Sequence, residues 1–197
     1  MKRAAFWLML SVYWLATAQS KAASLSGTVT VDGIPVGGAV VYLESTSDHP
    51  RRSLNSSPVV IEQRNLTFSP GVIPIVQGTT VTFANQDSVP HGVYSPSVEA
   101  GKFNLKTYGH GEERRMVFAS PGEVIVLCNI HPEMEARLLV LKDPYFATTA
   151  AGGQYQVRGV PPGTYLLRVW RARSSTSADP VELSLAGDLT LDLRLNP

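Results

Sequence analysis

Cysteine is almost absent from this sequence: its 197 residues include only one, Cys128, within the segment CNIHPEME. A single cysteine excludes an internal disulfide framework. In an exported chain, a lone thiol is an intermolecular partner, a buried inert side chain or a metal ligand. The residues around Cys128 are therefore the first candidates for a functional site.

The sequence also lacks a strong net charge. It has 17 Lys and Arg against 16 Asp and Glu, a formal net charge of +1. Loss of the first 18 residues would remove Lys2 and Arg3 and leave about −1. Nucleic acids and anionic membrane surfaces both require clustered positive charge, so neither is expected as a partner. Electrostatic steering of any protein partner should be weak.

Long apolar runs are missing except at the N-terminus. Lys2 and Arg3 precede an apolar stretch over residues 4–15, and ATA at residues 16–18 fits a small-residue cleavage site. We interpret residues 1–18 as a signal peptide, which predicts export to the periplasm or the exterior. The apolar stretch is shorter than the roughly 20 residues of a spanning helix, so no stable membrane span is expected in the mature chain. A retained anchor is the lesser alternative.

Helical periodicity is absent after residue 18. Short apolar segments with alternating character are separated by clusters of Gly, Pro, Asn and Asp, which predicts an all-β fold. The block from Val59 to Leu141 contains about eight such segments, the number typical of a Greek-key sandwich. They are VVIEQ, NLTFSP, VIPIVQ, TTVTFAN, HGVYS, RRMVFA, EVIVLC and ARLLVL.

The flanking segments predict a second, smaller β-sandwich. Residues 25–44 supply two strands, and an isolated hairpin is marginal in water. The tail supplies three or four more strands, in GQYQVRGVPPGTYLLRVW and VELSLAGDLTLDLRL. Joining 24–45 with 143–197 gives one discontinuous sandwich, with 46–58 as a linker and 59–142 as an inserted domain. The alternative is an N-terminal extension packed on the middle block, with an independent tail domain.

Four side chains in the middle block form a candidate metal site. His91 lies in the turn after the strand TTVTFAN, Cys128 ends the strand EVIVL, and His131 and Met134 follow in the next loop. Each residue alone more often has a packing or loop role. Together, two imidazoles, a thiolate and a weak thioether are the ligand set of a mononuclear blue-copper site that cycles between Cu(I) and Cu(II).

Other Cys/His chemistry fits this pattern less well. A zinc site would need a fourth ligand from Glu133 or Glu135, because methionine binds zinc poorly. Covalent haem needs a second cysteine, and a Cys–His protease dyad is awkward within so tight a loop. No pairing of general acid and base stands out, so an enzyme is not expected. The remaining histidines, His49 and His110, are expected to be exposed loop residues.

The segment FANQDSVPHGVYS, followed by GEVIVLCNIHPEMEARLLV, resembles the plastocyanin/azurin family of cupredoxins, with the short ligand loop of amicyanin-like members. The resemblance covers about residues 59–141. It implies a Greek-key sandwich that holds one copper at its pole through His91, Cys128, His131 and Met134. It also implies that His131 is the electron exit point and that Pro132 lies in the docking patch.

The flanks GTVTVDGIPVGGAVVYLES and GGQYQVRGVPPGTYLLRVW resemble the two halves of a carboxypeptidase regulatory-like domain. The combined order is similar to bacterial methylamine-utilisation or plastocyanin-like proteins. Two positions depart from the cupredoxin pattern. Many members have Asn directly after the first histidine to tie the two ligand loops together, whereas this chain has Gly92, which predicts a looser tie. Glu133 replaces an apolar residue before Met134; its charge would favour the oxidised metal if it lies beside the site, and the alternative is that it points to solvent and has little effect.

The leading functional hypothesis is an exported blue-copper protein that transfers single electrons between redox partners, through a transient protein complex. The alternative is a periplasmic copper-binding or copper-handling module without an electron-transfer role. A third possibility is an interaction protein in which the smaller sandwich docks a partner and the metal site is secondary.

Overall fold

A computed structural model of the chain describes residues 22–46, 58–98, 101–173 and 179–195. Within these ranges every regular element is a β-strand, which confirms the all-β prediction. None of the described segments forms a helix long and apolar enough to cross a membrane. The predicted signal peptide over 1–18 and nearly all of the predicted linker over 46–58 lie outside the described residues.

The strands, in chain order, are β1 (Ala23–Val31), β2 (Ile34–Pro35), β3 (Val40–Ser45), β4 (Val59–Arg64), β5 (Thr67–Ser69), β6 (Val72–Val76), β7 (Thr79–Asn85), β8 (His91–Ser95), β9 (Phe103–Tyr108), β10 (Glu113–Phe118), β11 (Gly122–Leu127), β12 (Glu135–Leu141), β13 (Phe146–Thr148), β14 (Gln154–Val160), β15 (Gly163–Trp170), β16 (Val181–Leu185), β17 (Leu189–Thr190) and β18 (Leu193–Leu195).

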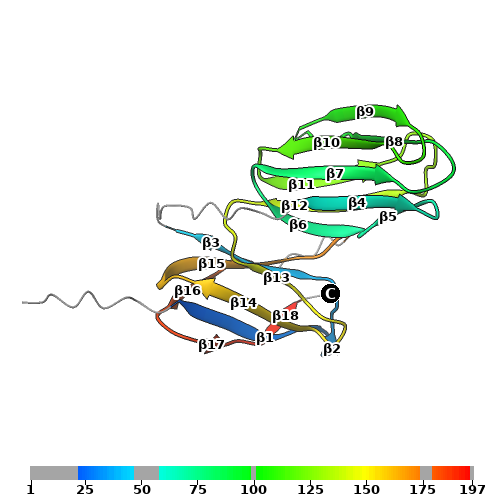
Figure 1. The fold of residues 1–197 in the computed structure, drawn as a ribbon. Coiled ribbons are helices and arrows are strands. Elements are labelled where there is room, and N and C mark those ends of the chain that lie inside the picture. The colour runs from blue at the N-terminus through cyan, green and yellow to red at the C-terminus, as the bar shows by residue number, and fades with distance from the viewer. Residues whose placement is uncertain (1–21, 47–57, 99–100, 174–178, 196–197) are drawn as a thin grey trace, which may run out of the picture.

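The middle of the chain folds into a sandwich of two sheets, drawn in cyan to yellow-green in Figure 1. One sheet has the order β10-β7-β4-β5, and the other has the order β6-β12-β11-β8-β9. Most pairs are antiparallel, but β4 pairs with β7 and β6 with β12 in parallel. The sequence predicts about eight strands here. The structure adds β9, an edge strand whose short alternation lies between the glycine turns at residues 101 and 109–111.

Alternation along the central strands sets which side chains enter the core of this sandwich. In β11 the buried residues are Val124 and Val126, and Cys128 continues the same alternation one step beyond the strand. Successive side chains of a strand point to opposite faces, so Cys128 is directed into the sandwich. The core cluster accordingly contains all three residues, together with Met134 of the following loop.

The segments on either side of this block form the second sandwich, at the bottom of Figure 1. One sheet has β1 at its centre, paired with β14, β2, β17 and β18, and the other has the order β13-β3-β15-β16. Residues from both ends of the chain share its core, among them Leu25, Leu43 and Leu167. The structure therefore contains the small discontinuous sandwich that was expected from the fold class.

Two breaks between strands of this second sandwich have clear causes, one local and one set by a neighbouring strand. Asp32 and Gly33 both have positive φ, of 50° and 78°, which matches the two-residue hairpin turn between β1 and β2. The leucines at 189, 191, 193 and 195 alternate as one strand in sequence but form β17 and β18. The chain breaks at Leu191, whose carbonyl oxygen lies so close to Gly27 of β1 that a Cβ there would overlap it.

The two sandwiches pack against each other through β12. Its even-numbered residues, such as Leu138, enter the core of the first sandwich, while Leu139 and Leu141 form a separate buried cluster with Val40 of β3. Trp170 of β15 packs on this cluster and donates from its indole nitrogen to Glu123 at 3.3 Å. Both faces of β12 are therefore covered, which explains why ARLLVL is nearly continuously apolar.

Candidate metal centre

His91, Cys128 and His131 meet at one end of the first sandwich because of how β8 and β11 are paired. The two strands are neighbours and antiparallel, with Leu127 opposite Tyr94. The start of β8 therefore lies beside the end of β11. His91 is the first residue of β8, Cys128 follows β11 directly, and His131 lies in the loop to β12. Pairing in the sheet closes the 37-residue separation between His91 and Cys128.

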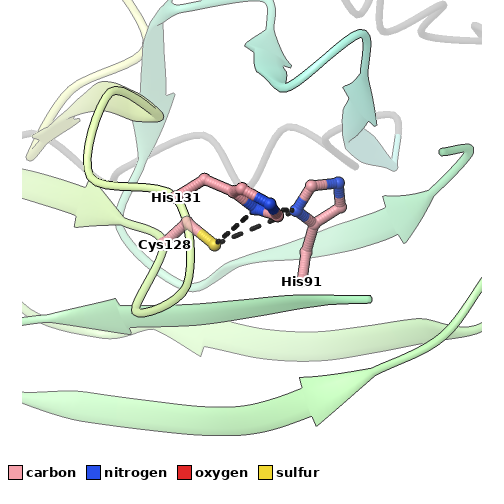
Figure 2. A group of neighbouring side chains, drawn as sticks. All are labelled: His91, Cys128 and His131. Carbon is pink, nitrogen blue, oxygen red and sulfur yellow. Dashed lines mark hydrogen bonds between the residues drawn. The ribbon is translucent and has the colours of Figure 1, made fainter. Parts of the chain in front are cut away.

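The ligand atoms of these three residues form a compact triangle (Figure 2). The Nδ1 atoms of His91 and His131 lie 3.0 Å apart, and the Sγ atom of Cys128 lies 3.9 Å from each of them. His91 is fully buried, Cys128 is 4% exposed and His131 is half-buried. The triangle is thus enclosed on the protein side and reaches solvent through the ring of His131.

The dimensions of this triangle fit a metal ion. An ion in its plane, about 2.0 Å from both Nδ1 atoms, would lie about 2.3 Å from the sulfur. These are the bond lengths that first-row metals such as zinc make to imidazole nitrogen and to thiolate. Two nitrogens and one sulfur in a plane form the trigonal arrangement that suits copper in an electron-transfer site.

Met134 belongs to the same loop and is 1% exposed. Its backbone closes the loop: the N–H of Met134 donates to the carbonyl of His131 at 3.1 Å, and its own carbonyl accepts from the N–H of Cys128 at 3.2 Å. The close triangle consists of His91, Cys128 and His131, and Met134 packs in the adjoining core. The axial role that the spacing predicts for Met134 stays a prediction.

The carboxylate of Asp87, which the sequence pattern does not mark as part of the site, contacts the buried histidine. The Nε2 atom of His91 lies 2.9 Å from Oδ2 of Asp87, four residues earlier in the loop that leads into β8. The Asp87 carboxylate also accepts the backbone N–H groups of Asn65 and Leu66, at 2.6 and 3.0 Å. Burial acts to raise the pKa of Asp87, but these N–H groups and His91 together hold it below its usual value.

Asn85 shapes the loop that places Asp87 and His91. Its side-chain Nδ2 group donates to the backbone carbonyls of Val89 and Tyr108, at 2.9 and 3.2 Å. Its side-chain Oδ1 atom accepts the backbone N–H of Asp87 at 2.9 Å. Asn85 is completely buried. The tripeptide Asn-Gln-Asp after a strand was the available signal for this arrangement, because Asn and Asp side chains commonly bond nearby backbone groups in turns.

The space after His91 is filled from the other ligand loop. Gly92 leaves room beside its backbone, and the side chain of Asn129 occupies it: a Cβ on Gly92 would overlap Oδ1 of Asn129 and lie 2.7 Å from its Cγ. Asn129 directly follows Cys128, so the residues after the two ligands contact each other. This is a packing contact between the two ligand loops, and the looser tie expected from Gly92 stays a prediction.

Tyr108 lies next to the site, because it is paired with His91 across the neighbouring strands β9 and β8. Its hydroxyl donates to the carbonyl of Phe83 at 3.3 Å and accepts from the amide of Gln63 at 2.7 Å. The guanidinium of Arg114 lies 4.8 Å from the ring centre. Burial raises the pKa of Tyr108 above its usual range, so this hydroxyl stays protonated beside the cluster.

The remaining polar residues considered in the sequence lie outside the triangle. Glu133 is exposed, and Glu135 binds Arg137 and Arg173. His110 is exposed, as expected, and its Nδ1 atom lies 3.0 Å from the backbone carbonyl oxygen of Asp87. His49 lies outside the described residues. Among the described residues, no carboxylate joins the three-residue cluster as a fourth zinc ligand.

No family model matches this chain, and no curated protein matches its sequence. Solved structures that match include a copper-containing nitrite reductase from Thermus scotoductus SA-01, with 26% identity and a TM-score of 0.42; the match covers 57% of this chain but only 28% of the reductase. A purple cupredoxin from Nitrosopumilus maritimus has 28% identity and a TM-score of 0.37, over 44% of this chain and all of its own. A Cu(I) form of an amicyanin mutant has 18% identity and a TM-score of 0.41, and the match covers 51% of this chain and 98% of the amicyanin chain.

These neighbours are cupredoxins and copper proteins by their descriptions. The resemblance of the flanking segments to a regulatory-like domain stays a prediction. The strand order of the middle sandwich and the His–Cys–His triangle at its pole bear out the sequence-based resemblance: this part of the chain is cupredoxin-like.

Proposed function

We propose that this protein is an exported blue-copper protein that transfers single electrons between redox partners. Its mononuclear copper site would use His91, Cys128 and His131 in a plane, with Met134 as a weak axial ligand. The observation that carries this proposal is the buried triangle of two Nδ1 atoms and one thiol sulfur, with dimensions that suit a trigonal metal. Copper in such a set supplies a reversible one-electron change.

The protein would contribute a rigid and dry ligand set. His91 is held by Asp87. Cys128 is held by its place directly after β11 and by its N–H bond to the carbonyl of Met134, and both ligands are shielded from water. Fixed ligands need little rearrangement when the charge of the site changes, which favours rapid electron transfer in both directions. The same burial supports retention of the metal over delivery of it to another protein.

His131 is the proposed exit point because it is the ligand that reaches solvent. Exposed apolar residues lie at the same pole: Leu66 is 41% exposed, Val89 38% and Ile130 42%, and Pro132 is also exposed. With a near-neutral chain, docking of the redox partner would depend mainly on this apolar rim. Such contacts suit a small and transient interface.

The test is to add Cu(II) to the purified protein and to record the visible spectrum. We expect an intense thiolate-to-copper charge-transfer band that disappears in Cys128→Ser. His110→Gln is the matched control, because His110 is an exposed histidine at the same pole and outside the triangle, and the band should persist. Absence of the band from the wild-type protein would refute the proposal.

A second measurement separates electron transfer from copper handling. An electron carrier should keep its copper in the presence of a competing chelator and should give a reversible one-electron wave in voltammetry. A metal-delivery module should lose copper to the chelator quickly. Competition between Cu(II) and Zn(II) on the same samples tests the zinc alternative, since zinc would give no visible band.

We also propose the domain boundaries predicted from the sequence: a regulatory-like domain from 24–45 and 143–197, and an inserted copper domain over 59–142. Two separate hydrophobic cores support this division. Expression of residues 59–142 alone should give a folded protein that binds copper. N-terminal sequencing of protein recovered from the periplasm tests the proposed signal over 1–18, with a mature start after Ala18 as the expected result.

A further inference from the structure

Asp87 joins two parts of the first sandwich that are distant in sequence. Its Oδ2 atom contacts Nε2 of His91 at 2.9 Å and accepts the N–H of Leu66 at 3.0 Å, while Oδ1 accepts the N–H of Asn65 at 2.6 Å. The Asp87 side chain is 13% exposed and His91 is fully buried. Little water therefore competes for the bond between them, and a hydrogen bond in such surroundings is electrostatically stronger than one in water.

The carboxylate also holds a turn in an unfavourable conformation. Asn65 and Leu66 connect β4 and β5, and both have positive φ, of 53° and 55°. This region is sterically unfavourable for an ordinary L-residue such as Leu, whereas Asn tolerates it better. Because both backbone N–H groups of the turn donate to Asp87, the turn and the carboxylate fix each other. The position of Asp87 is fixed further by Asn85, which accepts its backbone N–H.

These contacts determine which nitrogen of His91 carries the proton. An ionised carboxylate only accepts hydrogen bonds, so the group that faces Oδ2 must be an N–H. His91 therefore holds its proton on Nε2. In the neutral ring the other nitrogen, Nδ1, then has a free lone pair, and Nδ1 is the atom that faces Cys128 and His131. The hydrogen bond on one side of the ring thus prepares the other side for a metal.

We propose that Asp87 is a positioning residue of the metal centre: it fixes the orientation and tautomer of His91 and makes its Nδ1 atom a stronger donor to the metal. The inference rests on the proposed copper site and deepens it. A negative charge behind the imidazole stabilises the more positive oxidised metal more than the reduced one. Asp87 therefore lowers the reduction potential of the centre, and it does so from outside the ligand set.

The first experiment uses the metal-free protein. Nitrogen NMR of the histidine side chains should show His91 of the wild type with its proton on Nε2. In Asp87→Ala the preference should be lost, with both tautomers populated. A wild-type His91 that carries its proton on Nδ1 would overturn the proposal whether or not the protein binds copper. Failure of the proposed function and failure of this inference are therefore separable.

The second experiment compares Asp87→Asn with the matched control Glu133→Gln. Both changes remove one negative charge close to the ligands, but Glu133 is exposed and precedes Met134 without forming part of the triangle. We expect Asp87→Asn to weaken Cu(II) binding by about 10–100-fold, the usual effect of losing such an outer partner. Cu(I) binding should weaken less. Each tenfold difference between the two losses raises the reduction potential by about 59 mV.

The control should change both affinities and the potential far less. Equal shifts in Asp87→Asn and Glu133→Gln would show that only general charge matters, and would overturn the proposal.

Loss of the Asn65–Leu66 turn could produce similar effects indirectly, so a third variant separates the two roles of Asp87. Leu66→Gly relieves the positive-φ strain and keeps the backbone N–H groups. If Asp87 acts through His91, Leu66→Gly alone leaves the potential and the His91 tautomer unchanged, and Asp87→Asn shifts the potential equally in either background. If Asp87→Asn no longer shifts the reduction potential in the Leu66→Gly background, Asp87 acts on the metal centre through the Asn65–Leu66 turn, and the proposal is wrong.

Discussion

The contact between Gly92 and Asn129 allows a quantitative test of how the two ligand loops are held together. Gly92 follows His91, and Asn129 follows Cys128. In Gly92→Ala the added Cβ would overlap Oδ1 of Asn129 and lie 2.7 Å from Cγ and 3.2 Å from Nδ2. The φ of Gly92 is not in the positive region that only glycine favours, so the new methyl group causes steric conflict but no backbone strain.

The expected cost follows from two opposing terms. Insertion of a methyl group into a packed contact costs typically 1–3 kcal/mol. Replacement of glycine by alanine reduces the freedom of the unfolded chain and returns about 0.4–1 kcal/mol. Gly92→Ala should therefore lower the free energy of unfolding by about 1–2 kcal/mol. In Asn129→Gly the obstructing side chain is gone, and adding Gly92→Ala to it should be neutral or slightly stabilising.

The assay is a double-mutant cycle measured by urea unfolding of the metal-free protein. Trp170 is the only tryptophan beyond residue 18, so its fluorescence reports on the contact between the sandwiches, and circular dichroism reports on the strands. We expect a coupling energy of at least about 1 kcal/mol between the two positions. Independent sites add within about 0.3–0.5 kcal/mol, so a cycle that closes within that range would refute the reasoning.

Three further predictions concern other parts of the molecule. Burial raises the pKa of Tyr165 from 10.0 to about 12. Between these two values the unfolded chain has lost this proton while the folded chain keeps it, so stability should fall by about 1.4 kcal/mol per pH unit. Tyr165→Phe should remove that share of the slope in urea unfolding at rising pH. Leu43→Ala, at a position 1% exposed in the second core, should cost about 2–5 kcal/mol in the same unfolding assay and leave the copper spectrum unchanged. Trp170→Ala removes packing on Leu139 and the bond to Glu123, and should split thermal unfolding into two calorimetric transitions.

Much of the fold could be predicted from the sequence because a β-strand with one buried face has a short, local pattern of alternating apolar and polar residues. Alternation such as Tyr165, Leu167 and Val169 in β15 follows directly from the two-residue period of a strand with one buried face. The Asp32-Gly33 turn was equally local. Predictions were less accurate where a strand on another part of the chain interrupts a local pattern. The leucines of the tail alternate as one strand, but β1 interrupts them at Leu191.

The candidate ligands could be named for a similar reason. Cys128, His131 and Met134 share one short loop, and His91 follows a strand end, so their residue types and spacing alone suggested a copper site. The sequence could not reveal how the ligands are supported. The Asn-Gln-Asp tripeptide indicates a turn at Asp87, but nothing local shows that its carboxylate contacts His91 or that Asn129 packs beside Gly92.

The sequence by itself determined the all-β character, the identity of the candidate ligands and the near-neutral surface, because each depends on residue type and on periods of a few residues. Only the tertiary structure decided how His91 is oriented. Asp87 meets the Asn65–Leu66 turn across 21 and 22 positions of sequence, and Asn129 enters the space beside Gly92 from the loop after β11. Such contacts depend on strand pairing and on backbone angles, and these are set by the packing of the whole sandwich.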